Sequence, residues 1–370
     1  MTELVLNATA SATPLAKHLT TQNSSSGLVP YFGALTAHHF DAPERETGAL
    51  LRGAAVHDLG WLRRVAVRGE DRLRWLSGMV TNAVETLADS SGAYNLVLNA
   101  QGRIQGDAYV WRNGEALEIE TSAEQLEPLL THLDHFIIMD DVELVSLPDQ
   151  TAIGITGPAA DRILTGLGLS PLDEALSLAD GTVGDIPIRI ERRYGTIVPH
   201  YALWANVEHT AAAWQAIVDA GATPVGSAAL ETLRIVEGIP AYGIDIQSRD
   251  LAQETGQTRA LNFTKGCYLG QEIVERIRSR GQVHRYLRSV ELIPDNEAEV
   301  PATGTELRGS SNDGKPAGSI TSVAAVRLNE VTRVFGIAMV RSEAEVGGKL
   351  LVYASGKAQI LKTPPKFAAA

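Results

Sequence analysis

The most informative stretch of the chain is Lys265-Gly266-Cys267-Tyr268-Leu269-Gly270-Gln271-Glu272. Apolar residues recur every four positions from Leu269 onward, which predicts a helix over about 269–280 that Gly281 closes. Cys267, the only cysteine of the chain, therefore precedes a helix N-terminus and follows Lys265 by two residues. Because a cation and free amide N–H groups both favour a thiolate over a thiol, we expect Cys267 to be the reactive group and Lys265 to keep it ionised.

The charge around this stretch is opposite in sign to that of the whole chain. The 370 residues carry 32 basic and 44 acidic side chains, a formal net charge of −12, which disfavours general binding of nucleic acid or of an anionic membrane. From Lys265 to Arg288, however, six basic side chains accompany two acidic ones, a local charge of +4. An anionic partner fits this patch: a carboxylated or phosphorylated small molecule, or a locally docked RNA. Composition alone leaves a structural role open, because a lone cysteine is more often a small buried side chain.

Composition and length describe an ordinary globular protein. Hydrophobic residues make up 44% and charged residues 21%, and the length suggests two to three domains. One cysteine excludes an internal disulfide framework and suits a reducing compartment. No apolar run reaches the roughly 18–20 residues that span a bilayer, and the first segment lacks the Lys or Arg of a secretory signal. We therefore expect a cytoplasmic protein with a flexible leader over 1–30 and a frayed tail over 363–370.

Helical and strand patterns alternate through the body of the chain and then change. A hairpin is predicted over 94–111 with its turn at 99–102, and a strand at 152–155 leads into a helix. Further helices are predicted over about 121–137, 208–220 and 227–237. After about Ser289, short β-type runs are separated by Gly, Pro and Asn clusters. The pattern predicts an α+β body followed by a small all-β barrel or sandwich.

The stretch Lys265–Glu272 matches K-G-C-Y-x-G-Q-E, the signature of the YgfZ family. Besides Lys265 and Cys267, the matching motif residues are Gly266, Tyr268, Gly270, Gln271 and Glu272. The chain resembles this family from about Val56 to about Ile360. Proteins of the family bind folate and are related to the glycine-cleavage T-protein, an aminomethyltransferase. The family also includes a mitochondrial iron–sulfur assembly factor.

The resemblance implies the cloverleaf fold of the T-protein. In that fold two interleaved α+β domains, the second of them ferredoxin-like, join a C-terminal β-barrel around a central hole that binds tetrahydrofolate. We accordingly expect a folate-binding region over 31–285, with the second domain inserted at about 150–225, and a barrel over 286–362. Residues 230–242 would return to the first domain after the insert.

The resemblance also implies a folate site that contains Asp107, Arg234, Tyr242 and Tyr94. Arginine suits the carboxylates of a folate tail, and tyrosine suits stacking with a hydrogen-bonding tip. Two positions depart from the aminomethyltransferases. Only Asp107 remains of their Asp-Asp pair, because Gly106 precedes it. No acidic residue occupies 193–201 around Gly195, where they carry a glutamate that grips the pterin ring.

Taken together, the resemblance implies a folate-dependent accessory factor for the assembly or repair of iron–sulfur clusters. Its partners would be iron–sulfur client enzymes, among them tRNA-modifying ones, or assembly proteins, with tetrahydrofolate or a related reduced folate as cofactor. We expect no stable nucleic-acid binding and no membrane binding. Because clusters usually take four thiolates, Cys267 would contact a cluster or sulfur transiently, and no permanent metal is expected.

Two other functions remain open from the sequence. The first is a tetrahydrofolate-dependent one-carbon transferase with Asp107 at the reacting centre. For the aminomethyl transfer of glycine cleavage, however, the two departures predict that a physiological rate is not reached. The second is a folate-binding or interaction module without chemistry.

Overall fold

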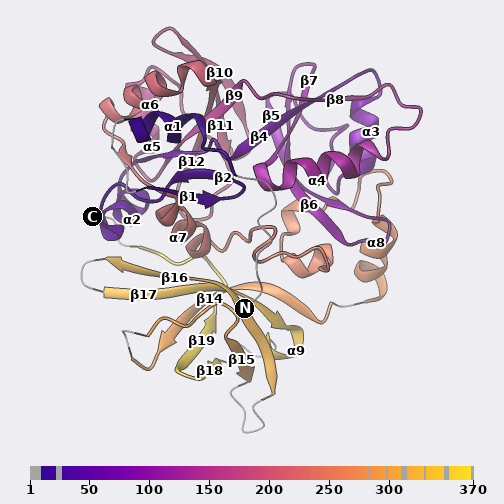
Figure 1. Cartoon of the computed structure of the whole chain (residues 1–370). Coiled ribbons are helices and arrows are strands. Elements are labelled where there is room, and N and C mark those ends of the chain that lie inside the picture. The colour runs from indigo at the N-terminus through magenta and orange to yellow at the C-terminus, as the bar shows by residue number, and fades with distance from the viewer. Residues whose placement is uncertain are drawn as a thin grey trace.

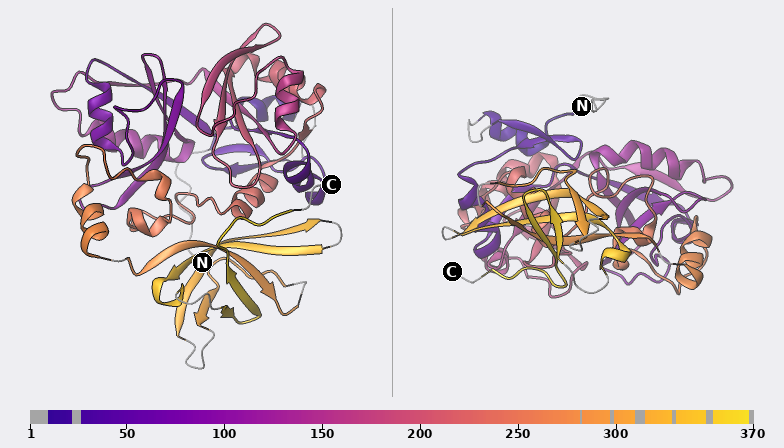
Figure 2. Two further views of the ribbon diagram at one scale, coloured as in Figure 1. Left: turned by 180° about the vertical axis from the view of Figure 1, so that it is seen from behind. Right: turned by 90° about the horizontal axis from the view of Figure 1, so that it is seen from below.

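A computed structural model of the chain describes residues 10–21, 27–281, 283–296, 299–309, 315–328, 331–345 and 350–367. Two α+β lobes lie side by side above a β-barrel (Figure 1), and the view from behind shows the same three-part arrangement (Figure 2). Each lobe is built on its own sheet, and the six strands of the barrel close on themselves. The predicted fold class, an α+β body with a C-terminal β-barrel, is confirmed.

The first lobe contains an antiparallel five-stranded sheet. Its strand order is β5 (Ser91–Leu98), β6 (Ile104–Asn113), β7 (Ala116–Ser122), β4 (Leu62–Arg68) and β8 (Glu143–Ser146). Alternate apolar residues of the central strands pack against Leu76 of α3 (Arg72–Met79) and against Leu129 and Leu133 of α4 (Ala123–Asp134). β5 and β6 form the predicted hairpin, in which Leu96 lies opposite Asp107.

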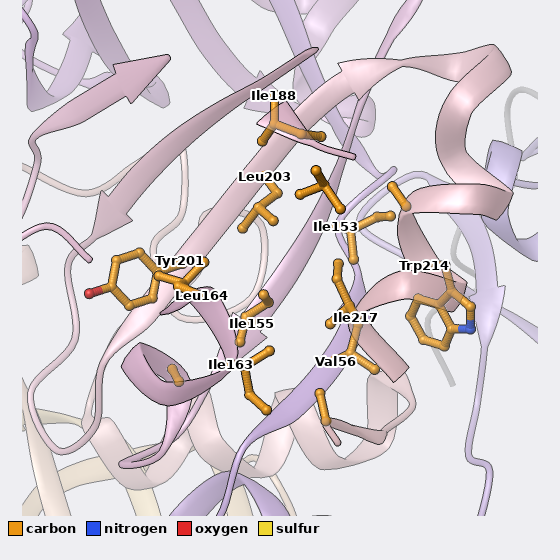
Figure 3. Packing of buried hydrophobic residues seen from close by; sticks show 14 of the residues in the cluster. Val56, Ile153, Ile155, Ile163, Leu164, Ile188, Tyr201, Leu203, Trp214 and Ile217 are labelled. Carbon is orange, nitrogen blue, oxygen red and sulfur yellow. The ribbon is translucent and has the colours of Figure 1, made fainter. Parts of the chain in front are cut away.

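The second lobe contains a six-stranded sheet that draws on two separate parts of the chain. Its order is β10 (Leu178–Val183), β11 (Ile186–Arg193), β12 (His200–Asn206), β9 (Gln150–Thr156), β3 (Ala55–Asp58) and β13 (Thr223–Pro224). Its core is one buried cluster that includes Leu164 of α5 (Ala160–Gly166), Trp214 of α6 (Thr210–Asp219) and Ile155 of the central strand β9 (Figure 3). A short 3₁₀ helix, η1 (Val207–His209), precedes α6. The sheet thus reaches beyond the predicted insert at 150–225, because β3 precedes the first lobe in the chain.

The flexible leader predicted over 1–30 is wrong for the part that the structure describes. Helix α1 (Pro14–Thr21) buries Leu15 and Leu19 in the core of the second lobe, because residues four apart share one face of a helix. It is followed by the hairpin of β1 (Leu28–Tyr31) and β2 (Ala34–Ala37). Residues 1–9 and 22–26 lie outside the described residues.

The frayed tail predicted over 363–370 is wrong for Phe367. Its ring packs against Phe335 of the barrel, with 6.0 Å between the ring centroids. Two aromatic rings in such contact bury apolar area that would otherwise face water. Residues 368–370 lie outside the described part of the chain.

The barrel is closed in the order β14 (Arg285–Pro294), β17 (Val331–Arg341), β16 (Pro316–Leu328), β15 (Glu306–Gly309), β18 (Leu351–Tyr353) and β19 (Gly356–Ile360). A short helix, α9 (Ser342–Glu345), follows β17. Above the barrel, α2 (Pro43–Arg52) and α7 (Ser227–Glu237) contribute Leu50 and Leu233 to one buried cluster with Phe335. The connection from α7 back to the barrel contains η2 (Ala252–Thr255), η3 (Thr258–Ala260) and α8 (Gln271–Arg280).

The two lobes meet at a buried cluster of charges around Arg64 of β4. The side chain of Arg64 is fully buried and contacts three carboxylates. Its Nη1 lies 2.7 Å from Glu118 Oε2, and its Nη2 lies 3.2 Å from Glu120 Oε2, both on β7. The same Nη2 donates to Glu191 of β11, which belongs to the sheet of the other lobe.

Two further arginines of β11 balance this cluster. Arg193 Nη1 lies 2.6 Å from Glu120 Oε1, and Arg189 Nη1 lies 3.2 Å from Glu118 Oε2. Three guanidinium groups thus face three carboxylates across the boundary between the lobes. Buried charges are stable only when they are paired and hydrogen-bonded, so this cluster requires one alignment of the two sheets.

We predict that Arg64→Met strongly destabilises the protein. Three glutamates would remain with two arginines, and the uncompensated buried charge should lower the free energy of unfolding by about 3–5 kcal/mol, as measured by urea denaturation. Arg45→Met is the matched control, because Arg45 pairs with Asp41 at the surface with 77% of its side chain exposed. That variant should change stability by less than about 1 kcal/mol. Equal losses in the two variants would contradict the prediction.

Candidate functional site

A cavity of about 220 Å³ lies where the two lobes, the β1–β2 hairpin and α7 meet. Its wall contains all four residues that the resemblance assigned to the folate site, namely Tyr94, Asp107, Arg234 and Tyr242. They come from β5, β6, α7 and the segment after α7, so the fold brings together residues that are far apart in sequence. This cavity is the candidate binding site.

Both carboxylate oxygens of Asp107 are held by neighbouring side chains of the cavity wall. Its Oδ2 accepts a hydrogen bond of 2.7 Å from the Tyr94 hydroxyl, and its Oδ1 accepts one of 2.9 Å from Gln125 Nε2. The Gln125 amide also accepts the backbone N–H of Asp107 at 2.9 Å. Burial raises the pKa of Asp107, although these hydrogen bonds and the positive charge of Arg259 act in the opposite direction. The carboxyl is therefore a group that can take up a proton inside the cavity.

The replacement of the first aspartate of the pair by Gly106 has a local reason. A Cβ atom at position 106 would lie 3.0 Å from Gln125 Oε1 and 3.2 Å from a methyl group of Leu129. A larger side chain there would press on the amide that holds Asp107. Gly106 therefore leaves room for the two-point contact between Gln125 and Asp107.

Arg259 does not line the cavity but contacts two aromatic rings that do, a role that the sequence does not indicate. Its guanidinium carbon lies 4.2 Å from the ring centre of Tyr94 and 3.8 Å from that of Tyr194. Such cation–π contacts hold both rings in place, and Tyr94 and Tyr194 both line the cavity. No local pattern marks Arg259, because its partners lie in the two lobes and it lies on η3.

Arg234 lines the cavity, but its hydrogen-bonding groups serve the fold. Nε and Nη2 donate to the carboxylate of Glu231, and Nη1 donates to Ile239 O and Asp245 Oδ2. Nη2 also donates to Ser322 Oγ of the barrel at 3.0 Å. All five N–H groups of the guanidinium are thus in use. The predicted contact of Arg234 with a folate carboxylate is therefore not supported, and the residue joins α7 to the barrel.

Tyr242 keeps its predicted place at the cavity. It is half-buried, and burial raises the pKa of its hydroxyl, with a further contribution from the charge of Asp107. Two further aromatic residues in contact with each other line the cavity. The ring of Phe32, at the tip of the β1–β2 hairpin, lies 4.8 Å from that of Trp61, and both line the cavity. The apolar and aromatic surface suits a flat ring system.

A row of polar side chains crosses three neighbouring strands and reaches α7. We call His57, Thr156, His200 and Glu237 the polar row; all four line the cavity. Thr156 Oγ1 lies 2.9 Å from His57 Nε2 and 3.3 Å from His200 Nδ1, and His200 Nε2 lies 2.9 Å from Glu237 Oε2. The strands β3, β9 and β12 are adjacent in the sheet, so the row follows from strand order.

The members of the polar row are far apart in the chain, so no local sequence pattern predicts the row. The turn that follows β9 was recognised as a strand-to-helix turn, but nothing in it pointed to the histidines on the neighbouring strands. One signal was available in Gly154, which pairs with His57 in the sheet. Any Cβ at position 154 would overlap the imidazole ring of His57. Only glycine leaves space for that ring.

Cys267 lies apart from the cavity, among residues that do not line it in the described part of the chain. The residue is exposed, three positions before Gly270, which caps α8. The predicted helix over 269–280 is observed as Gln271–Arg280. The thiol is therefore accessible from solvent and is not part of the cavity wall.

Lys265 does not face the thiol as predicted. Its Nζ donates to the backbone carbonyls of Ser77, Val80 and Asn82 at 2.5, 2.6 and 2.7 Å. These three contacts use all three N–H groups of the ammonium. Burial lowers the pKa of Lys265 to about 8. Lys265 therefore fastens the loop that carries Cys267 to the end of α3, and its predicted role of keeping the thiol ionised is not supported.

The other motif residues shape this loop. Gly270 has a φ of +81°, and a Cβ there would lie 2.6 Å from Asn99 O, so only glycine fits. Gln271 Oε1 accepts the backbone N–H of Tyr268, whose ring is buried, at 3.3 Å. Gly266, before Cys267 in the chain, and Glu272, in the first turn of α8, are exposed to solvent. The motif thus presents Cys267 on a loop of fixed shape.

Comparison with protein families places the chain. The model of the GCVT N-terminal domain family matches residues 18–265, about two thirds of the chain. The chain belongs to this family. Among solved structures, the glycine cleavage system aminomethyltransferase T of Bartonella henselae has a TM-score of 0.83 with 16% sequence identity, covering 96% of this chain and 98% of that one. This likeness shows that the GCVT-family fold extends through the barrel.

Relatives of known name align with most of this chain and with most of their own length. The aminomethyltransferase of Geobacillus kaustophilus is 27% identical over 331 residues, which are 86% of this chain and 88% of that protein. A chloroplastic protein of Arabidopsis thaliana, named as a transferase, is 24% identical over 359 residues, 95% of this chain and 79% of the relative. Within the described ranges, no helix is long and apolar enough to cross a membrane.

We predict that His57 makes the protein more sensitive to acid. Burial lowers its pKa to about 3, below the value of 6.5 for an ordinary histidine. Between these pH values the unfolded chain binds one more proton at this residue than the native protein, so native stability falls as the pH falls. Relative to His57→Asn, the wild type should lose about 1.5 kcal/mol of unfolding free energy between pH 6.5 and pH 5.

Urea denaturation of both proteins at each pH measures this difference. Taking the difference cancels the opposite effect of Asp58, whose pKa burial raises to about 6. A stability difference between the two proteins that stays constant with pH would show that His57 does not titrate as described.

Proposed function

We propose that the protein is a YgfZ-type member of the GCVT family that binds a reduced folate, tetrahydrofolate or a close relative, in the cavity. We further propose that it supports the assembly or repair of iron–sulfur clusters in client enzymes, including tRNA-modifying ones. One observation carries the proposal. A cavity with a buried carboxyl and aromatic walls is combined with an exposed cysteine that lies outside it.

The residues of the cavity fit a folate. A cavity of about 150 Å³ holds a benzene ring, so a cavity of about 220 Å³ has room for a larger ring system. Phe32, Trp61 and Tyr242 offer apolar and aromatic surface to such a ring. Asp107 offers a carboxyl whose oxygens each have one hydrogen-bond donor from the protein and a second lone pair to spare. Bound folate would supply a carrier for one-carbon units.

The exposed thiol fits a transient role toward a cluster. Cys267 is the only cysteine of the chain, whereas iron–sulfur clusters usually take four thiolates. The cluster would therefore be cargo that is shared with a client enzyme or an assembly protein, rather than a resident cofactor. A single cysteine without a disulfide partner also suits the reducing cytoplasm, which is where we propose that the protein acts.

A second candidate function is a tetrahydrofolate-dependent one-carbon transferase. Two observations favour it: the raised pKa of the buried Asp107, which lets a carboxyl exchange protons in the cavity, and the names of the relatives. This function gives no role to Cys267, which lies on an exposed loop outside the cavity. Normal turnover in a reconstituted glycine-cleavage assay would favour the transferase over the accessory factor.

We predict that tetrahydrofolate binds saturably and that Asp107→Asn weakens binding about 10- to 150-fold, which corresponds to a hydrogen bond with a charged group of about 1.5–3 kcal/mol. The asparagine keeps the size of the side chain but loses the negative charge. Isothermal titration calorimetry measures both constants. Asp219→Asn, an exposed change on α6, is the matched control and should bind as the wild type does. No saturable heat with wild-type protein up to millimolar ligand would refute folate binding.

We predict that Cys267→Ser abolishes complementation and leaves the melting temperature unchanged, because an exposed thiol contributes little to packing. The measurement is the activity of an iron–sulfur-dependent tRNA-modifying enzyme in cells that lack the factor. Thr264→Ser, on the same exposed loop, is the matched control and should complement fully. Full complementation by Cys267→Ser would show that the thiol has no role in the function.

A further inference from the structure

The polar row contains buried polar atoms that have no hydrogen-bond partner among the described residues. These atoms are His57 Nδ1, His200 Nε2 and Glu237 Oε2. His200 Nε2 and Glu237 Oε2 lie 2.9 Å apart, an ion-pair distance, without the alignment of a hydrogen bond. Buried polar groups in native proteins are nearly always hydrogen-bonded. Apart from the ion-pair contact between His200 and Glu237, the described part of the protein thus leaves the hydrogen-bonding capacity of these three atoms unused, and all of them belong to residues that line the cavity.

Glu237 is held in position by its other oxygen. Oε1 accepts the backbone N–H groups of Thr196, Ile197 and Val198 at 3.2, 3.0 and 3.3 Å. Its side chain is only 1% exposed. The carboxylate therefore cannot turn away, and Oε2 keeps a fixed direction. It lies against the same segment, 193–201, in which the aminomethyltransferases carry the glutamate that this sequence lacks.

The other acidic residues of the cavity wall have a hydrogen-bond or ion-pair partner at each carboxylate oxygen. Both oxygens of Asp107 accept hydrogen bonds, from Tyr94 and Gln125. Both oxygens of Glu120 pair with arginines of the cluster between the lobes. Among the described residues that line the cavity, Glu237 is thus the acidic residue with an oxygen that no hydrogen bond engages.

We propose that Glu237 Oε2 accepts hydrogen bonds from the donor edge of the pterin ring, the 2-amino group and N3–H, and replaces from α7 the glutamate missing near Gly195. The inference rests on the proposed binding of folate. A carboxylate is an acceptor only, so it matches an edge that consists of donors. His200, with 17% of its side chain exposed, covers this oxygen and must turn aside when the ligand enters. Thr156 and His57 orient His200 through the contacts of the polar row.

The test compares two ligands in the wild type and three variants. Calorimetry compares tetrahydrofolate with an analogue in which hydrogen replaces the 2-amino group. The wild type should prefer tetrahydrofolate by about 10- to 150-fold, the scale of a hydrogen bond to a charged group. Glu237→Gln should lose most of this preference, because the amide oxygen can still accept from Thr196–Val198 while the NH₂ group now faces the donors of the ligand.

Glu231→Gln is the matched control, since Glu231 lies on the same helix and pairs with Arg234. It should keep the preference of the wild type. His200→Ala should also keep the preference, because it removes the cover and not the acceptor. Retention of the preference by Glu237→Gln, or a preference below about threefold in the wild type, would overturn the inference while leaving folate binding intact.

Two further results are distinguishable. If the wild type binds neither ligand, the proposed function fails and the inference fails with it. If Glu237→Gln does not fold, as judged by its melting temperature, Glu237→Asp takes its place. That variant keeps the charge but withdraws the carboxylate by one methylene group, and it should lower the preference. An unchanged preference in Glu237→Asp would overturn the inference.

Discussion

The charge cluster around Arg64 is the constraint on which the rest of the structure depends. It joins β4 and β7 of one lobe to β11 of the other, and all of its charges are compensated only when the two sheets adopt one relative position. Two of its members, Glu120 and Arg193, also line the cavity. The cavity wall is therefore part of the interaction that aligns the lobes. Separating the lobes at this point would leave buried charges without partners, which costs several kcal/mol.

The need to pair buried charges also explains why the roles predicted for two cationic side chains, from residue type alone, are not supported. Arg234 and Lys265 are cations near the places where an anionic ligand or a thiolate was expected. The N–H donors of both side chains are engaged by other parts of the protein. Those of Arg234 join α7 to the barrel, and those of Lys265 fasten a loop to the end of α3. A buried cation must be satisfied within the folded chain before it can serve a ligand. Sequence shows the charge but not the partners that satisfy it.

The parts of the fold that were predictable depend on local patterns. The hairpin of β5 and β6 and the change to all-β structure after Ser289 follow from alternation and turn residues within short windows. The family resemblance then supplied the cloverleaf arrangement and the location of Asp107, Tyr94 and Tyr242 at one cavity. What escaped prediction depends on strand order. The polar row exists because β3, β9 and β12 are neighbours in one sheet, and α1 is ordered because its apolar face meets that sheet.

At both positions where the sequence departs from the aminomethyltransferases, a polar side chain from a helix lies beside the changed position and lines the cavity. At position 106 the aspartate is gone, and Gln125 of α4 holds the remaining Asp107 from a side that a larger residue would block. In the segment 193–201 the glutamate is gone, and Glu237 of α7 brings a carboxylate against its backbone N–H groups. Gln125 is neutral and does not restore the charge of the missing aspartate, whereas Glu237 places a carboxylate beside the segment that lacks the glutamate. A family member can thus lose a local signature while a side chain from another element lines the same cavity. The absence of a local signature therefore does not by itself exclude a polar contact at that part of the cavity.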